Sequence, residues 1–244
     1  MKRHRKLLLA FLATLALAGT GCAKLQARDN LNKGVRAFRE QHYDNAVKYF
    51  QTAVELDPDL TTAEIYLATA YSQQFVPGGR GEENEKNAQL AIQTFEDVLK
   101  RDPNNVNAIA GLASIYQNLV QLQKSHDYYM KYAQLDSNNA IPYYAIGSLD
   151  WAIVYNKNGP PPEAEQIKFI DEGLANLDKA LALNPDYDDA MTYKNLLYRE
   201  KARLASNEED KKKLTEQADE WFNKSLDTRK KNAEKKKSAA VGNN

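Results

Sequence analysis

A short helical pattern recurs five times in this chain of 244 residues and constrains its fold more than any other feature. A small residue is followed four positions later by an aromatic or aliphatic one, three later by a small one, and five later by proline. These spacings place the side chains on one helical face, and the proline ends the helix. The copies are Ala46-Phe50-Ala53-Pro58, Ala91-Phe95-Val98-Pro103, Gly173-Leu177-Ala180-Pro185, the degraded Ser125-Tyr129-Tyr132-Ser137, and Ala218-Phe222-Ser225 without its proline. Such an array predicts stacked helices whose surface carries the function.

The best copy resembles the tetratricopeptide repeat. Within residues 28–59, Gly34 holds the small position of the first helix, Tyr43 the turn, and Leu56-Asp57-Pro58 the closing segment. Residues 106–139 fit the same 34-residue period without gaps. The resemblance implies an all-α, right-handed solenoid of about five helix-turn-helix repeats over residues 28–230. It is nearly silent on the partner, because the matching residues are packing residues.

Three repeats are longer than this period. Pro58 and Pro103 lie 45 residues apart, Ser137 and Pro185 lie 48 apart, and the last repeat needs extra residues before Ala218. The insertions fall between the two helices of their repeats, near residues 76–86, 156–166 and 205–215. The first two are rich in Gly and Pro, which predicts loops, whereas the third is expected to lengthen helices. They are either neutral elaborations or a partner-specific edge of the stack.

The first 21 residues have the pattern of an export signal. Residues 1–6 are basic, and residues 7–18 are apolar but too short for a resident membrane helix. The small residues that precede Cys22 resemble a bacterial lipoprotein processing site, which implies lipidation of Cys22 and a linker over residues 22–27. In the competing interpretation, cleavage after Ala18 would release a protein with a free thiol. Ala23, by resemblance to lipoprotein sorting, favours the outer over the inner membrane of a bacterium, on the periplasmic side.

The charge of the chain is unevenly distributed. The totals balance at 33 basic and 33 acidic residues, but residues 229–237 hold six basic residues and one acidic residue. Residues 23–228 are left with 23 basic and 32 acidic residues, and this acidic body argues against nucleic acid as a ligand. We expect residues 231–244 to form a basic, disordered tail. Its lysines are either a solvated helix end or a contact with anionic lipid or a partner.

No catalytic or cofactor-binding motif is recognisable. His42 and His126 are remote in sequence, and no pair of His or Cys residues has the spacing of a zinc site. The Gly-rich segment at residues 78–81 lacks the Gly-Lys-Ser/Thr of a phosphate loop. We therefore predict a protein that is not an enzyme and has no cofactor, bound metal or nucleic-acid partner.

The resemblance also implies that the first helices of the repeats line a concave groove. Small neutral residues occupy the centre of this predicted groove, and apolar, aromatic and arginine side chains occupy its ends. Tyr, Trp and Arg often dominate interface energies, although Phe38 and Trp151 could instead fill the gap to the next helix. Leu31 and Val35 replace the Lys and Asn of a carboxylate clamp, so chaperone-tail binding is not expected. The predicted groove residues are Arg28, Leu31, Phe38, Arg39, Gln73, Gln117, Asn118, Tyr144, Trp151 and Arg199.

The leading hypothesis is a non-enzymatic, membrane-tethered scaffold that binds a peptide or assembly partner in the groove. By analogy with lipid-anchored proteins of this family, it could be an accessory factor of envelope biogenesis, secretion or pilus assembly. The alternative is a periplasmic accessory for solute binding or transport, which would need a closed pocket.

Overall fold

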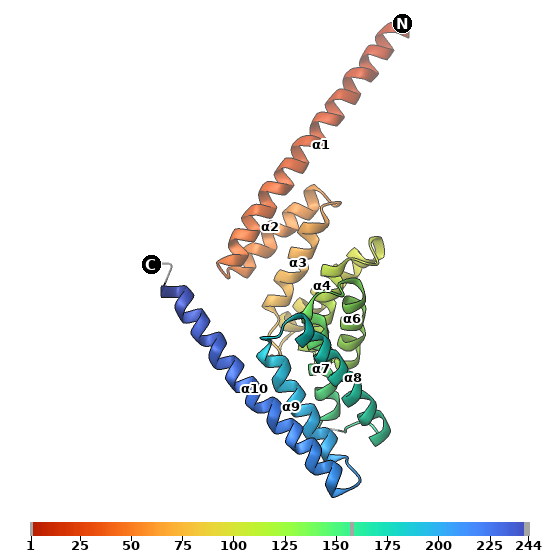
Figure 1. Cartoon of the computed structure of the whole chain (residues 1–244). Helices are drawn as coiled ribbons and strands as arrows, with labels where there is room; N and C mark the ends of the chain where they lie inside the picture. Colours follow the sequence, from red (N-terminus) through yellow and green to blue (C-terminus); the bar gives the residue numbers. More distant parts are fainter. Residues whose placement is uncertain (1, 157–158, 242–244) are drawn as a thin grey trace. The chain divides into compact units, whose positions relative to one another are not determined.

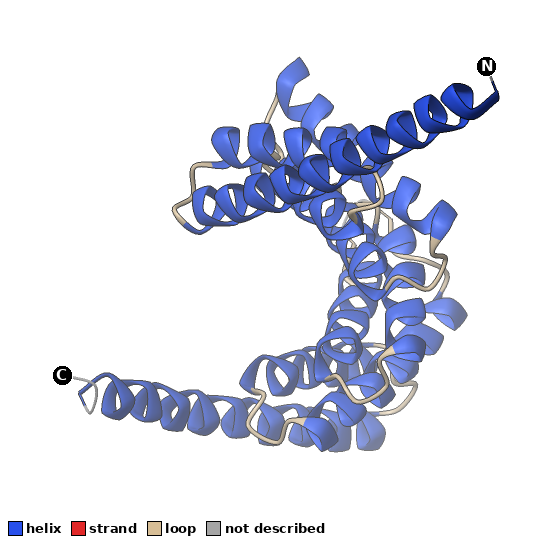
Figure 2. Ribbon diagram, turned by 90° about the horizontal axis from the view of Figure 1, so that it is seen from above, coloured by secondary structure: helices blue, strands red, loops and turns tan. Residues whose placement is uncertain are grey.

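The computed structural model describes residues 2–156 and 159–241, and every regular element within them is a helix (Figures 1 and 2). The predicted all-α fold of successive helix pairs is thereby confirmed. The described helices are α1 (Lys2–Arg39), α2 (Tyr43–Leu56), α3 (Thr61–Gln74), α4 (Glu82–Arg101), α5 (Val106–Asn118), α6 (Leu122–Leu135), α7 (Ala140–Val154), α8 (Glu163–Leu183), α9 (Asp188–Arg203) and α10 (Glu208–Val241).

Two compact bodies divide the chain. The N-terminal body comprises residues 1–119 with α1 to α5, and the C-terminal body comprises residues 120–244 with α6 to α10. Each body is described on its own below.

In the N-terminal body, the repeated pattern forms the seams between helices. Ala46, Phe50 and Ala53 are fully buried on α2, and the Phe50 ring stacks on Tyr66 of α3 with a centroid distance of 5.4 Å. A Cβ atom placed on Gly34 of α1 would lie 2.4 Å from the Phe50 ring, so only glycine permits this approach. The small positions therefore exist to admit the large ring of the neighbouring helix.

The C-terminal body repeats this packing with aliphatic side chains. Leu177 of α8 fills the space above Gly147 of α7, where an added Cβ would lie 2.5 Å from its side chain. Leu197 of α9 does the same above Gly173 of α8, at 2.7 Å. The last copy differs, because Phe222 on α10 is 44% exposed. The described helices therefore cover the large residue of this copy only in part.

The first helices of successive repeats form an inner row within each body. Helix α3 contacts both α1 and α5, and α7 contacts α9. In the described chain, no such contact joins the second helices, α2 to α4 or α8 to α10. Within each body, the first helices of neighbouring repeats therefore pack directly against one another, whereas the second helices do not.

The insertions lie between the helices of their repeats. The first forms a loop that Asn84 holds in place, because its side chain accepts from the Val76 amide at 2.7 Å and donates to the Val76 and Gly79 carbonyls at 3.0 Å. It also lengthens α4. The second forms the loop before α8, of which residues 157 and 158 lie outside the described residues. The third lengthens α10, which has 34 residues.

The C-terminal segment corrects one expectation. Residues 231–241 are helical rather than disordered, because the aspartates at the start of α9 hold this part of α10. Asp186 pairs with Lys231 at 3.1 Å and Lys235 at 2.7 Å, and Arg229 pairs with Asp188 at 2.9 Å. Residues 242–244 of the expected tail lie outside the described residues.

At the other end of the chain, α1 runs without a break through the predicted signal segment and linker into the first repeat. Across the residues that were described, none of the helices combines the length and the apolar character needed to cross a bilayer.

Candidate functional site

Five aromatic side chains of the C-terminal body form a continuous cluster on the inner row. Tyr144 on α7 lies 4.7 Å from the Tyr187 ring and 5.7 Å from the Tyr193 ring on α9, measured between centroids. Trp151 lies 5.7 Å from Tyr193 and stacks on Tyr155 at 4.9 Å. We call these five residues the aromatic row.

Helix geometry explains how the row is built. Tyr144 and Trp151 are seven residues apart on α7, which places them on one face about two turns apart. Tyr193 comes from the adjoining helix and sits edge-on to both rings. None of the five is fully buried, and Tyr155 is 46% exposed. The row is thus held by its own ring contacts and still reaches solvent.

The hydroxyl groups of Tyr144, Tyr187 and Tyr193 remain protonated at neutral pH, because the pKa of each is raised. Burial raises the pKa of Tyr144, and neighbouring Tyr193 and Asp189 raise it further. Burial is also the main cause that raises the pKa of Tyr193, and the Asp189 carboxylate raises it further. These phenols can donate hydrogen bonds, and Asp189 places a negative charge beside them.

The structure brings together only two of the predicted groove residues of this body. Tyr144 and Trp151 belong to the aromatic row. Arg199 instead donates to Asn195 at 2.9 Å and to Asp219 of α10 at 2.8 Å. It therefore helps to dock α10 on α9.

The predicted groove residues of the N-terminal body all lie at the surface or at its edge. Arg28, Arg39 and Gln73 are exposed, whereas the others are half-buried, namely Leu31, Phe38, Gln117 and Asn118. Phe38 packs edge-on against Tyr43 at 5.3 Å, which gives it a packing role in its own repeat.

Sequence reasoning missed three members of the row: Tyr155, Tyr187 and Tyr193. Tyr155 and Tyr187 lie just outside the ends of helices, where the repeat pattern assigns no residue to the groove. Tyr193 lies within α9, one residue after a position that the pattern assigns to the groove. The available signal was the abundance of tyrosine, 14 residues in the chain.

A buried charged pair lies beneath the same helices. The His126 Nε2 atom of α6 lies 3.2 Å from the Asp150 Oδ1 atom of α7, and Asp150 is fully buried. Burial raises the pKa of Asp150 to about 6, and His126 opposes this shift. Burial disfavours the charged form of His126, but Asp150 outweighs this effect and raises the pKa of His126. The pair is shielded from solvent, so its role is in packing rather than in chemistry on a substrate.

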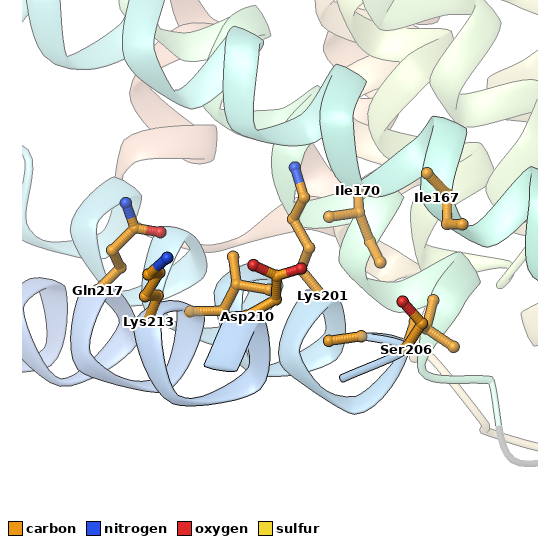
Figure 3. Close-up of a pocket in the computed structure, with 10 residues that line it drawn as sticks. Ile167, Ile170, Lys201, Ser206, Asp210, Lys213 and Gln217 are labelled. Carbon is orange, nitrogen blue, oxygen red and sulfur yellow. The ribbon is translucent and has the colours of Figure 1, made fainter. Parts of the chain in front are cut away.

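A half-open pocket of about 490 Å³ lies where α8, the end of α9 and the start of α10 meet (Figure 3). Ile167 and Ile170 form its apolar side, and residues of the third insertion form the opposite wall, including Ser206 and Asp210. Its lysines already have partners, because Lys201 pairs with Asp171 at 2.6 Å and Lys213 with Glu209 at 2.7 Å. Within the described residues, no three His, Cys, Asp or Glu side chains are grouped so that they could hold a metal ion.

Comparisons with known proteins agree with this architecture. Residues 30–60 match the family described as tetratricopeptide repeat, and residues 160–244 match the plant-specific mitochondrial import receptor subunit TOM20. A chloroplastic tetratricopeptide repeat domain-containing protein of Arabidopsis thaliana, PYG7, is 38% identical over 72 residues, or 30% of this chain. The match spans only 20% of the length of that relative.

Solved structures share the fold along most of the chain. MamA from Desulfovibrio magneticus RS-1, solved from its residue 41 to the end, superposes with a TM-score of 0.62 at 16% identity, covering 84% of this chain and 96% of the solved chain. YrrB, described as a TPR protein with an unusual peptide-binding site, superposes with a TM-score of 0.55 at 17% identity, covering 82% and 90%. The chain therefore contains a tetratricopeptide repeat and has the all-helical solenoid fold of tetratricopeptide-repeat proteins.

Proposed function

We propose that this chain is a non-enzymatic interaction scaffold that binds an extended peptide segment of a partner protein on the aromatic row. The observation that carries the proposal is the cluster of Tyr144, Trp151 and Tyr193 on the inner row. Tyrosine and tryptophan are enriched among the residues that dominate binding energy. The fold supports the proposal, since YrrB, which shares it, is described as having a peptide-binding site.

The chemistry of the row indicates what it can bind. The ring faces offer apolar area at a small entropic cost, and the protonated phenols can donate to the carbonyl groups of an extended backbone. Asp189 is exposed and pairs with Arg229 of α10 at 3.4 Å, so a basic residue in the bound segment would share this carboxylate with that arginine. A peptide with apolar side chains and a flanking Lys or Arg meets all three conditions.

The test uses peptides selected from a random library on the intact chain. Tyr144→Ala with Trp151→Ala should weaken binding of the selected peptides at least tenfold, because two anchors are lost. The matched control is Tyr49→Ala with Phe222→Ala, since both side chains are exposed aromatics outside the row. Circular dichroism and thermal unfolding verify that each variant is folded. Equal affinity for the row variant and the wild type would refute the proposal.

We further propose that the scaffold is exported and held by a lipid on Cys22, at the periplasmic side of a bacterial outer membrane. An accessory role in envelope biogenesis, secretion or pilus assembly is the setting we propose for it. Cys22 is exposed on α1 and is the only cysteine of the chain, so its thiol is accessible for acylation. Cys22→Ser should move the protein from the membrane to the soluble fraction, with Ser238→Ala as a surface control. Unchanged membrane retention would contradict the lipid anchor but leave peptide binding untouched.

A solute-binding role is less well supported than peptide binding. The pocket between α8, α9 and α10 would be its site, but it is half-open and its lysines are already paired. Exposed ion pairs contribute little stability, so they would not prevent a solute from entering. Because both lysines of the pocket are paired, however, neither is available to recognise a particular solute.

A further inference from the structure

A stripe along α10 combines exposed apolar residues with lysines. Phe222, Leu226, Lys230, Ala233 and Lys237 follow one another at steps of four, four, three and four residues. These steps keep the five side chains on one helical face. Phe222 and Leu226 are 44% and 46% exposed. We call this set the α10 stripe.

Another face of α10 packs against the C-terminal body. Ala218 and Ser225 are buried against it. Arg229, Lys231 and Lys235 are paired with the aspartates at the start of α9. The α10 stripe is therefore fixed in orientation by the body, and it lies beside the buried side of the helix.

Three other lysines near the end of α10 do not pair with the aspartates near the start of α9. Within the described residues, Lys230, Lys236 and Lys237 are exposed and form no ion pair, and Glu234 is the only acidic residue among residues 229–237. The stripe thus has an apolar half followed by a basic half. A helix with this distribution is suited to the boundary between lipid headgroups and acyl chains, where the apolar side chains insert and the lysines meet phosphates.

We propose that the α10 stripe docks on an anionic phospholipid surface and orients the C-terminal body there. The contact does not depend on the proposed peptide site or on acylation of Cys22. An acidic protein could also meet the lysines, but it would leave Phe222 and Leu226 without an apolar partner. The convex surface of a single helix also suits a broad lipid surface better than a compact ligand.

The experiment uses the full chain with Cys22→Ser, which removes the only thiol and any acyl group. An environment-sensitive fluorophore is attached to a cysteine introduced by Ala233→Cys, inside the stripe. The control label is placed by Ala175→Cys, an alanine on α8 that is also exposed. The probes are vesicles of phosphatidylglycerol with phosphatidylcholine, vesicles of phosphatidylcholine alone, and polyglutamate. Residues 1–21 are present in every sample, so only differences between samples are interpreted.

The expected result is a blue shift of the label at position 233 with phosphatidylglycerol vesicles only, and none at position 175. A basic residue near an anionic surface strengthens binding about fivefold, so replacing Lys230, Lys236 and Lys237 by Gln should raise the half-saturating lipid concentration roughly a hundredfold. The control replaces Lys211, Lys212 and Lys213 by Gln, which removes the same charge from the other end of α10. It should change that concentration less than fivefold.

Several outcomes would overturn the proposal. These are the absence of a shift at position 233, an equal shift at position 175, or equal losses in the two triple variants, which would indicate a net-charge effect. A response to polyglutamate as strong as that to vesicles would assign the lysines to an acidic protein instead. Phe222→Ser with Leu226→Ser provides a second test that leaves the charge unchanged, and it should also weaken vesicle binding.

Discussion

The ring of Phe50 occupies the space that a side chain on Gly34 would need. An added Cβ on Gly34 would lie 2.4 Å from Phe50 Cε1, and the Phe50 ring is also held by stacking on Tyr66 at a centroid distance of 5.4 Å. Gly34→Ala should therefore destabilise the N-terminal body, although alanine is the better helix former by about 1 kcal/mol. Overpacking typically costs about 1–3 kcal/mol, so we expect a net loss of up to about 2 kcal/mol in urea unfolding.

The double variant Gly34→Ala with Phe50→Leu serves as the control for this first prediction. The smaller Leu side chain relieves the clash, so the effects of the two substitutions should not add. Strictly additive losses would show that the two residues do not compete for the same space.

The second prediction compares two phenylalanines at equivalent positions of the repeat pattern. Phe50 is fully buried, whereas Phe222 is 44% exposed. Phe50→Ala should cost about 3–5 kcal/mol, because it leaves a cavity that its neighbours cannot fill. Phe222→Ala should cost under about 1 kcal/mol, since an exposed side chain leaves no cavity. Similar losses for the two variants, measured by chemical unfolding, would contradict the different packing of the last repeat.

The packing of the helices could be predicted from the sequence because it depends on local spacing. Ala46, Ala91 and Ala180 are all buried, as the recurring pattern required, since a small residue at this spacing has no other use in a helical stack. Phe222 shows the limit of that reasoning. The pattern identifies the position, but it does not show how far neighbouring helices cover the side chain.

The candidate site was predicted only in part. Tyr144 and Trp151 lie on a first helix and follow from the repeat register, but Tyr187 and Tyr155 join them from positions that flank helices. The pairing of His126 with Asp150 joins residues 24 positions apart, and no local pattern signals it. The sequence favoured a disordered tail for the end of α10, with a solvated helix end as an alternative, because its charges give no sign of the Asp186 carboxylate that pairs with Lys231 and Lys235.

The third prediction concerns the contact that holds the end of α10. Lys235 and then Lys231 donate to the Asp186 carboxylate and hold its pKa below the usual range. The contact is therefore present above the pKa of an unfolded Asp and is lost as the pH falls through the lowered value. Asp186→Asn should speed amide hydrogen exchange in residues 231–241 several-fold at neutral pH, with no change in α7.

Asp227→Asn is the matched control for this exchange experiment, because Asp227 is an exposed carboxylate on α10 itself. The difference between the Asp186→Asn variant and the wild type should shrink at high salt and in acid. Protection of residues 231–241 that is indifferent to Asp186 would mean that another contact holds this end of the helix.

The fourth prediction follows from the buried pair of His126 and Asp150. Burial raises the pKa of Asp150 to about 6, and Asp150 raises the pKa of His126 against the effect of burial. Both groups therefore bind a proton more tightly in the folded state than in the unfolded state. By linkage, stability falls as the pH rises from about 4, the unfolded value for Asp, through the folded pKa of His126.

Neighbouring charges from the packed helices must be counted with this pair. Glu172 of α8 raises the pKa values of both groups, and the nearby Asp127 carboxylate raises that of His126. Between about pH 5 and pH 8, the wild type should lose on the order of 1–2 kcal/mol more stability than Asp150→Asn, measured by urea unfolding at each pH. The variant keeps the shape of the side chain but removes its charge, so His126 stays neutral when buried. Asp127→Asn, at the exposed neighbour, should nearly preserve the wild-type profile. Parallel profiles for the wild type and Asp150→Asn would show that the pair does not change its protonation in this range.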